Sequence, residues 1–427
     1  MTTTQHEEIP QLAADAVARG GDLVVMKFGG SSVGDTAKIK DVARRLVAAR
    51  EGGSRVVGVL SAMGDSTDDL IRLAFEISPH PHPREYDMLV SVGERISNAL
   101  CAMAIHDLGH EAISLTGSQA GILTDTSHGK AKIVEVRAQR INEALDDEKI
   151  VLVAGFQGVS AEHEVTTLGR GGSDATAVAL AAALGGACEI FTDVEGVFSA
   201  DPRLVPEALK LPKVSYEEML EMAATGARVM MARSIEIARR YGVPLHVRST
   251  FSDAEGTWIC AEDQLMLEKA IVSGVTHDTT EAKATVTGMP DRPGVAASIF
   301  RALADAGVNI DMIVAAGGAT DISFTLPKTD LATAQPILER VCKEVGAQEL
   351  TFDSNIGKVS LIGAGMKSHP GVAADMFEAL ADAGINIEII STSSIRVSCV
   401  VRADDVERAV RAVHERFQLF AEERVAG

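Results

Sequence analysis

The chain has 427 residues, and its 40 Lys and Arg against 60 Asp and Glu give a formal net charge of −20. This balance excludes an extended basic face for nucleic acid, although it is compatible with a small pocket of positive charge. Hydrophobic residues make up 46% of the chain and aromatic residues 4%, which excludes wholesale disorder and aromatic stacking platforms for bases or sugars. The length predicts two or three domains.

The N-terminus and the cysteines indicate a reduced, cytoplasmic protein. Residues 1–22 have neither the basic start nor the apolar stretch of a signal peptide, and we expect them to form a short extension. No apolar run reaches the length of a membrane-spanning helix, so we expect no membrane partner. The five cysteines are scattered, odd in number and without a CxxC pair, which is typical of buried reduced thiols.

Residues 23–265 alternate apolar, β-branched runs with Ala-rich stretches of helical periodicity. This alternation predicts one α/β domain whose mainly parallel sheet is covered by helices on both faces. The expected strands are Leu23–Phe28, Val56–Leu60, Ile150–Ala154, Glu189–Thr192 and Pro244–Arg248. The expected helices are Thr36–Arg50, Asp87–Leu108, Ser173–Leu184 and Ser234–Tyr241. We expect the junction to the rest of the chain in Ser249–Lys269.

Two glycine-rich loops inside this domain indicate a phosphate site. Met26–Gly34 follows the first expected strand, and Thr167–Asp174 leads into an Ala-rich helix. Adjacent glycines let backbone N–H groups approach an anion, and a helix N-terminus adds its dipole. Lys27 and Arg170 supply positive charge. Neither loop is a P-loop or a dinucleotide fingerprint, and either loop taken alone is equally typical of a tight turn with a helix cap.

The C-terminal part of the chain contains an internal repeat. Residues 291–314 (DRPGVAASIFRALADAGVNIDMIV) match residues 368–391 (SHPGVAADMFEALADAGINIEIIS) without gaps, 77 residues apart. An apolar stretch precedes and another follows each copy, and a helical pattern comes last, which predicts the ferredoxin-like order βαββαβ. We therefore expect two tandem units, at residues 270–350 and 356–427.

Four ordered motifs of the first domain resemble those of aspartate kinases, which are members of the amino acid kinase family. They are Lys27–Ser32 (KFGGSS), Gly93–Ser97 (GERIS), Thr166–Asp174 (TTLGRGGSD) and Thr192–Arg203 (TDVEGVFSADPR). The repeated unit is similar to the paired ACT domains with which these enzymes sense amino acids. The resemblance runs from residue 23 to the C-terminus and implies a three-layer α/β sandwich, the amino acid kinase fold, followed by two ACT domains.

The resemblance implies transfer of the γ-phosphoryl group of ATP to the β-carboxylate of L-aspartate, which gives 4-phospho-L-aspartate on the way to lysine, threonine and methionine. A carboxylate is already ionised at neutral pH, so this transfer needs alignment and charge neutralisation and no general base. The implied cofactors are ATP and Mg²⁺, with Mg²⁺ bridging ATP oxygens and no metal ligand assigned to the protein.

The same resemblance implies the roles of individual residues. Lys27, Arg170 and Asp174 are the implied catalytic residues. The substrate site is implied at Ser61, Thr67, Glu94, Phe156, Arg170 and Ser173, with Arg170 holding a substrate carboxylate and Glu94 the α-ammonium. The nucleotide site is implied at Lys27, Gly29, Gly30, Ser31, Thr192, Asp193, Phe198, Asp201, Arg203 and Arg228. Phe198 and Arg228 depart from the family, where Tyr and Lys are usual.

The repeated unit implies regulation by an amino acid such as lysine or threonine, and assembly of a homo-oligomer through these domains. The implied effector residues are Asp291, Gly294, Val295 and Ala296 in the first copy and Asn386, Ile387 and Ser391 in the second. Inhibited relatives usually continue after Val314 with Gln-Asn and a longer polar loop, whereas this chain has the short Ala315–Thr320, and Ser394 replaces an acidic residue. We expect concerted feedback inhibition to be weakened or lost.

Two other functions fit parts of the same pattern. Another carboxylate kinase of the family, acting on glutamate or N-acetylglutamate, would share the glycine-rich loops but generally lacks two ACT copies. A catalytically weak amino-acid-sensing protein would need the repeat but not Lys27, Glu94, Arg170 and Asp174, all of which are present. The sequence does not specify the effector, the number of subunits, or whether a shorter regulatory chain is also made.

Overall fold

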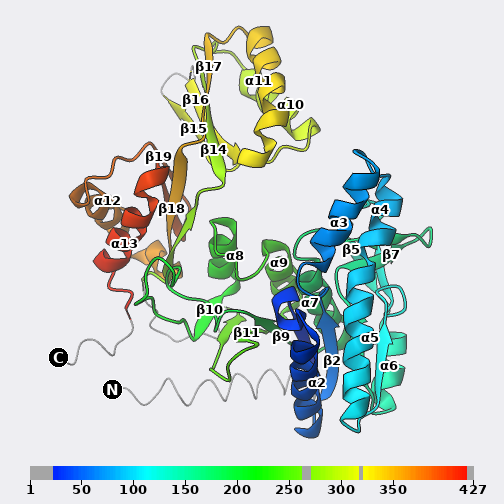
Figure 1. Cartoon of the computed structure of the whole chain (residues 1–427). Coiled ribbons are helices and arrows are strands. Elements are labelled where there is room, and N and C mark those ends of the chain that lie inside the picture. The colour runs from blue at the N-terminus through cyan, green and yellow to red at the C-terminus, as the bar shows by residue number, and fades with distance from the viewer. Residues whose placement is uncertain (1–22, 262–270, 317–320, 421–427) are drawn as a thin grey trace, which may run out of the picture. The chain divides into compact units, whose positions relative to one another are not determined.

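A computed structural model describes residues 23–261, 271–316 and 321–420, so the predicted extension at residues 1–22 lies outside the described residues. The chain divides into two compact units (Figure 1). The first comprises most of the chain up to residue 266, and the second comprises the remainder together with residues 198–209 and 224–227.

The first unit is built on an eight-stranded sheet with the strand order β10-β12-β11-β9-β1-β2-β6-β3. All neighbouring strands are parallel except β11 and β12, which confirms the mainly parallel sheet. The strands are β1 (Leu23–Phe28), β2 (Arg55–Leu60), β3 (Ala112–Leu115), β6 (Ile150–Ala154), β9 (Ala187–Thr192), β10 (Lys213–Ser215), β11 (Leu245–Ser249) and β12 (Thr257–Cys260).

Helices cover both faces of this sheet, as the alternation predicts. The helices are α2 (Thr36–Glu51), α3 (Ser66–Ile77), α4 (Pro83–Val90), α5 (Val92–Asp107), α6 (Gln139–Asp146), α7 (Gly172–Leu184), α8 (Tyr216–Ala224) and α9 (Ala232–Tyr241). Met26 and Phe28 of β1 belong to a buried cluster with α2 and α5. Because successive side chains of a strand point to opposite faces, Lys27 faces the other side, where α7 packs against β1 and β9.

A small second sheet in the same unit has the order β5-β4-β7-β8. Its strands are β4 (Ile122–Thr124), β5 (Ile133–Val136), β7 (Gln157–Ser160) and β8 (Val165–Thr167). The sequence pattern missed this sheet because its strands are only three or four residues long, too short to show a period. β8 runs directly into the second glycine-rich loop, so this sheet sets where that loop begins.

Three predictions about the first unit need correction. The expected helix Asp87–Leu108 is two helices, because Ser91 ends α4 before α5 begins at Val92. The expected junction Ser249–Lys269 contains β12, which pairs with β11 inside the main sheet. The stretch Pro83–Asp107 is long and apolar enough to cross a membrane by length and composition. This contradicts the prediction from the sequence that no apolar run reaches that length. Much of that stretch is buried inside the protein, which is typical of a core helix.

The second unit contains two four-stranded modules that follow the internal repeat. The first module has the predicted order βαββαβ: β14 (Glu281–Thr287), α10 (Val295–Asp305), β15 (Ile313–Ala316), β16 (Asp321–Pro327), α11 (Leu331–Val345) and β17 (Glu349–Asp353). The second has β18 (Ile356–Ile362), α12 (Val372–Asp382), β19 (Ile389–Thr392), β20 (Arg396–Arg402) and α13 (Val406–Arg416).

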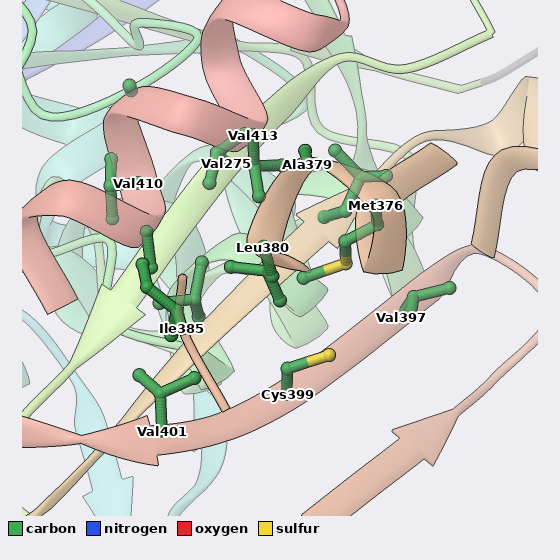
Figure 2. Close-up of a cluster of buried hydrophobic side chains, with 14 of the residues drawn as sticks. Val275, Met376, Ala379, Leu380, Ile385, Val397, Cys399, Val401, Val410 and Val413 are labelled. Carbon is green, nitrogen blue, oxygen red and sulfur yellow. The ribbon is translucent and has the colours of Figure 1, made fainter. Parts of the chain in front are cut away.

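The second module takes its remaining strand from in front of the first module. β13 (Gly274–Asp278) pairs with β18 in the sheet β13-β18-β20-β19. Figure 2 shows the consequence, since Val275 of β13 packs with Leu380 of α12 and Val413 of α13 in one buried cluster. The two modules are therefore interlocked rather than strictly tandem. The predicted range 270–350 includes a strand, β13, that belongs to the second module.

The two modules contact each other through a small apolar cluster and a set of ion pairs. Met312 of the first module is buried with Ile356, Ile389 and Val400 of the second. Lys358 of β18 pairs with Asp311 and, at 2.9 Å, with Glu281 of the first module. In the opposite direction, Lys283 of β14 pairs with Glu388 of the second module.

These ion pairs repeat the internal symmetry of the sequence. Asp311 and Glu388 are the matching acidic residues that follow Asn-Ile in the two copies, and Lys283 and Lys358 begin the matching apolar stretches. Each lysine therefore pairs with the acidic residue of the other copy.

Candidate active site

Lys27 and Asp174 meet where the first strand ends and α7 begins. The Lys27 Nζ lies 2.6 Å from Asp174 Oδ1, and both side chains are about nine-tenths buried, with exposed fractions of 12% and 10%. Asp174 lies in the first turn of α7, where the helix dipole favours a negative charge. The two predicted catalytic residues at 27 and 174 are therefore brought together, although they stand far apart in the sequence.

The first glycine-rich loop is joined to the loop that follows β2. Gly29 precedes the short 3₁₀ turn Gly30–Val33. The Gly64 N–H donates to the Gly30 carbonyl at 3.2 Å, and a Cβ on Gly30 would lie 3.2 Å from the Ala62 carbonyl oxygen. There is thus little room for a side chain at Gly30, and the loop backbone stays close to residues 61–64. Ser61 and Ser31 lie on these two loops, Ser31 exposed to solvent.

Glu94 is a buried carboxylate beside this loop. Its exposed fraction is 3%, and a Cβ on neighbouring Gly93 would lie 2.6 Å from the Ala62 Cβ and 3.9 Å from the Thr67 hydroxyl. Burial raises the pKa of Glu94 to about 7, against the lowering effect of backbone hydrogen bonds from Glu94 and Ala62 and of the Arg95 charge. Within the described residues its Oε2 has no hydrogen-bond partner, so the carboxylate can accept from a ligand.

Phe156 and Ser173 pack around the start of α7. A Cβ on Gly172 would lie 2.9 Å from the Phe156 ring, and one on Gly155 would lie 2.6 Å from the Ser173 hydroxyl. Phe156 has a φ of +68°, in the left-handed region that a bulky residue rarely adopts. Its carbonyl accepts from the Leu168 N–H at 2.9 Å, which ties this strained turn to the second glycine-rich loop.

Arg170 is at the exposed tip of that loop. Gly169 and Gly171 on either side have φ of +75° and +71°, so the loop depends on residues without a Cβ. Among the described residues none forms an ion pair or hydrogen bond with the Arg170 side chain. An unpaired guanidinium beside a helix N-terminus can bind a carboxylate through two parallel hydrogen bonds.

The predicted nucleotide residues fall in both units. Thr192, at the end of β9, donates to Asp193 at 3.1 Å, and Arg228 is an exposed residue of the first unit. Phe198, Asp201 and Arg203 belong to the second unit. There, Arg203 donates to both carboxylate oxygens of Asp201, at 3.0 and 2.6 Å, and thereby holds the pKa of Asp201 below its usual value. Their roles toward a nucleotide remain predictions.

The predicted effector residues also fall into two groups. Gly294 caps the N-terminus of α10 with a φ of +98°, next to exposed Asp291 and Ala296 and buried Val295. Asn386 and Ile387 lead into β19, and Ser391 lies on that strand. The two groups belong to different modules, and their binding role is untested. Of the short loop Ala315–Thr320, residues 317–320 lie outside the described residues.

Sequence patterns missed two buried polar residues near the site. Asp87 is fully buried in α4 and accepts hydrogen bonds from the Thr167 backbone and hydroxyl. Asn98 lies one helical turn after Glu94, and within the described structure its Oδ1 has no partner. Both occupy buried faces of apolar helices, and a polar residue at a core position of such a helix is the signal that could have identified them.

The described residues contain no group of three or more His, Cys, Asp or Glu side chains that could hold a metal ion. Mg²⁺ commonly binds through one or two carboxylates and the phosphates of its substrate. Asp174 is such a carboxylate, at the mouth of a cradle of backbone N–H groups, and so these residues fit a nucleotide-bound Mg²⁺. All five cysteines are free and buried, as predicted.

Comparison with known proteins places this geometry in a family. Residues 22–249 match the model of the amino acid kinase family, and residues 285–341 and 359–417 match that of the ACT domain. The chain is 56% identical to an aspartokinase of Mycolicibacterium smegmatis, over 93% of this chain and 96% of that protein. It is 54% identical to an aspartokinase of Corynebacterium glutamicum, over 94% and 97%.

Among solved structures, the chain resembles E. coli aspartokinase III in complex with aspartate and ADP. The TM-score is 0.78 at 25% identity, covering 92% of this chain and 99% of that one. The same enzyme in complex with lysine and aspartate gives a TM-score of 0.74. The chain therefore belongs to the amino acid kinase family and, within it, to the aspartokinases that carry two ACT domains.

Proposed function

We propose that the chain is an ATP-dependent aspartate kinase that forms 4-phospho-L-aspartate. The observation that carries this proposal is the buried Lys27–Asp174 pair between two glycine-rich loops, beside a buried carboxylate with one free oxygen. The first arrangement suits a phosphoryl group, and the second suits the α-ammonium of an amino acid. Relatives at 53–56% identity over most of the chain bear the name aspartokinase.

The reaction is a displacement at the γ-phosphorus of ATP. A β-carboxylate oxygen of aspartate attacks, the bond to the β-γ bridging oxygen breaks, and ADP leaves with its electron pair. Lys27 and the N–H groups of Gly30 and Ser31 neutralise the transferring phosphoryl group, whereas the Gly29 N–H donates to the Phe191 carbonyl at 3.4 Å. Mg²⁺ held by the ATP phosphates, with Asp174 next to it, would add further positive charge. No residue has to remove a proton from the nucleophile.

The substrate is held at one of its carboxylates and at its α-ammonium group. Arg170 binds a carboxylate through its planar guanidinium, and Glu94 accepts from the α-ammonium. The pocket between Arg170 and Glu94 is lined by Ser61, Thr67, Phe156 and Ser173. The residues that bind the nucleotide are Thr192, Asp193, Phe198, Asp201, Arg203 and Arg228. Arg228 and Phe198 alter these contacts, because Lys and Tyr are usual at the two positions in the family.

Hydroxylamine trapping tests this activity directly. The purified chain with ATP and Mg²⁺ should yield a hydroxamate from L-aspartate, and far less from L-glutamate or N-acetyl-L-glutamate. Absence of aspartyl hydroxamate would refute the proposal, and a larger yield from N-acetyl-L-glutamate would favour the other carboxylate kinases. Omission of Mg²⁺ should abolish the yield.

We further propose that the enzyme is cytoplasmic, assembles as a homo-oligomer through its ACT modules, and responds weakly to amino-acid effectors. The last point depends on the short loop after Val314 and on Ser394. Aspartate phosphorylation should lose less than half its rate when lysine and threonine are added together at about 1 mM. Strong synergistic inhibition below that concentration would contradict the weakened response while leaving the catalytic proposal intact.

A further inference from the structure

Asp87 is a charged residue at the centre of the first unit to which the proposed chemistry gives no role. It lies in α4 with an exposed fraction of 0%. An ionised carboxylate in such a place is costly unless hydrogen bonds compensate it. Its position therefore requires an explanation from the groups that surround it.

Three donors and one imidazole nitrogen, from two separate loops, converge on this carboxylate. The Thr167 N–H donates at 3.1 Å and the Thr167 hydroxyl at 2.5 Å. The Gly129 N–H donates to both oxygens at 3.1 Å, and His128 Nδ1 lies 2.7 Å from Oδ2. The two carboxylate oxygens of Asp87 accept from all three donors, whereas an amide side chain of the same shape has only one oxygen with which to accept.

The two loops that Asp87 joins also contact each other. The Ala131 N–H donates to the Thr167 carbonyl at 2.9 Å, and a Cβ on Gly169 would lie 3.0 Å from the Gly129 carbonyl oxygen. From α9, Arg233 donates to the carbonyls of Leu168 and Ala131, each at 2.8 Å. The base of the second glycine-rich loop is therefore fixed from two helices by one buried acid and one half-buried base.

At the loop tip, by contrast, the Arg170 side chain has no hydrogen bond or ion pair within the part of the chain that the structure describes. Arg170 is exposed three residues after Thr167, and glycines flank it on both sides. The position of its guanidinium thus depends on the anchored residues 167 and 168 before it and on α7 after it. A displacement of about 1 Å at a substrate-positioning group can cost on the order of 100-fold in rate.

We propose that Asp87 is a positioning residue for the aspartate subsite: through Thr167 it fixes the loop that presents Arg170 to the substrate carboxylate. This inference rests on the proposed function, since it assigns Arg170 to aspartate. It predicts an effect on KM for aspartate that is larger than any effect on KM for ATP, because the nucleotide contacts proposed at Thr192 and Asp193 belong to β9 and the residue after it, and not to the anchored loop.

Asp87→Asn provides the first test, because the amide keeps the shape but directs an NH₂ group at donors. We expect KM for aspartate to rise about 10- to 100-fold while KM for ATP changes less than about twofold. Amide hydrogen exchange of residues 167–172 should accelerate. Tyr216→Phe is the matched control, since it removes another buried hydrogen bond of the same unit, the 2.6 Å bond to the Val243 carbonyl, and should leave both KM values unchanged.

Thr167→Val and the double variant complete a mutant cycle. Thr167→Val removes the hydroxyl donor but keeps the backbone N–H, so its effect should be smaller, and the double variant should resemble Asp87→Asn alone. Additive effects, or equal rises in both KM values, would overturn the inference even if the wild type is fully active. A wild type that gives no aspartyl hydroxamate would instead refute the proposed function, and this inference with it.

Discussion

Two buried charged groups, Glu94 in the first compact unit and Lys358 in the second, differ in how many partners they have. In the first unit, Glu94 is buried with one carboxylate oxygen unpartnered within the described structure, and Lys27 has a single acidic partner. In the second, buried Lys358 has two carboxylate partners and Arg402 has two more, Asp353 and Glu388. We interpret the unpartnered oxygen of Glu94 as a ligand contact and the doubly paired Lys358 as a structural charge.

The pKa directions agree with this contrast. Burial raises the pKa of Glu94 to about 7, so the ionised form is disfavoured in the ligand-free protein. Burial also acts to lower the pKa of Lys358, but Glu281 and Asp311 outweigh it and leave the pKa above its ordinary value. The first charge therefore decreases the stability of the folded state at neutral pH, and the second increases it.

The largest expected effect follows from removing Lys27. Lys27→Met should lower kcat for aspartate phosphorylation by at least about 1000-fold, because no other cation of the described first unit pairs with Asp174 beside the phosphoryl position. Steady-state assays measure this, with circular dichroism to show that the sheet persists. Lys40→Met, at an exposed position of α2, is the control. A loss below about tenfold would remove Lys27 from the catalytic site.

Glu94→Gln should separate binding from stability. The neutral amide cannot pair with the α-ammonium, so KM for aspartate should rise about 10- to 100-fold at pH 8. The same variant should be more stable than the wild type at pH 8, by about 3 kcal/mol, because the folded pKa of about 7 exceeds the ordinary value of 4.5. Urea unfolding of both proteins without ligand measures the difference.

The pH dependence of this variant gives an independent check. A raised folded-state pKa costs stability fully above about pH 7, and the cost disappears as the pH falls toward 4.5. The stability gain should therefore vanish near pH 5, and the rise of wild-type KM for aspartate below pH 7 should be absent from the variant. A variant less stable than the wild type at pH 8 would show that Glu94 is a structural residue.

The sequence alone predicted most of the first unit's architecture, but not the contact between Lys27 and Asp174. The runs at 23–28, 56–60 and 150–154 are strands because continuous β-branched segments suit a sheet buried on both faces. The glycine-rich loops indicated a phosphate site with Lys27 and Arg170, and the resemblance to aspartate kinases implied that Asp174 belongs to the same site. The pair contact itself depends on strand order, which no local pattern contains.

What could not be predicted depends on contacts between distant segments. Asp87 in an apolar helix has no local signal for its donors at Gly129 and Thr167. Likewise β13 resembles any short apolar strand, and only its pairing with β18 shows that it completes the second module. The reciprocal pairing of Lys283 and Lys358 required both the repeat and the three-dimensional structure.

Lys358→Met tests the structural side of the comparison. Removing the ammonium leaves Glu281 and Asp311 as unpaired carboxylates, and we expect the unfolding free energy at pH 7 to fall by about 2–3 kcal/mol. The raised lysine pKa means that this contribution is complete below about pH 10.5 and is lost as the pH rises further. Calorimetry at pH 7 measures the change, with exposed Lys343→Met as control. An unchanged stability would show that the pairs only offset their own desolvation.

The smallest effect is expected at Arg402, although it also has two acidic partners. Its side chain is 40% exposed, and its bonds to Asp353 and Glu388 measure 2.6 and 2.9 Å. Solvent screens an exposed pair, and Glu388 keeps Lys283 when Arg402 is absent. Arg402→Ala should therefore lower Tm by less than about 2 °C, whereas Lys358→Met lowers it several times more. A decrease at Arg402 as large as that at Lys358 would show that the number of partners, rather than burial, sets the strength of these contacts.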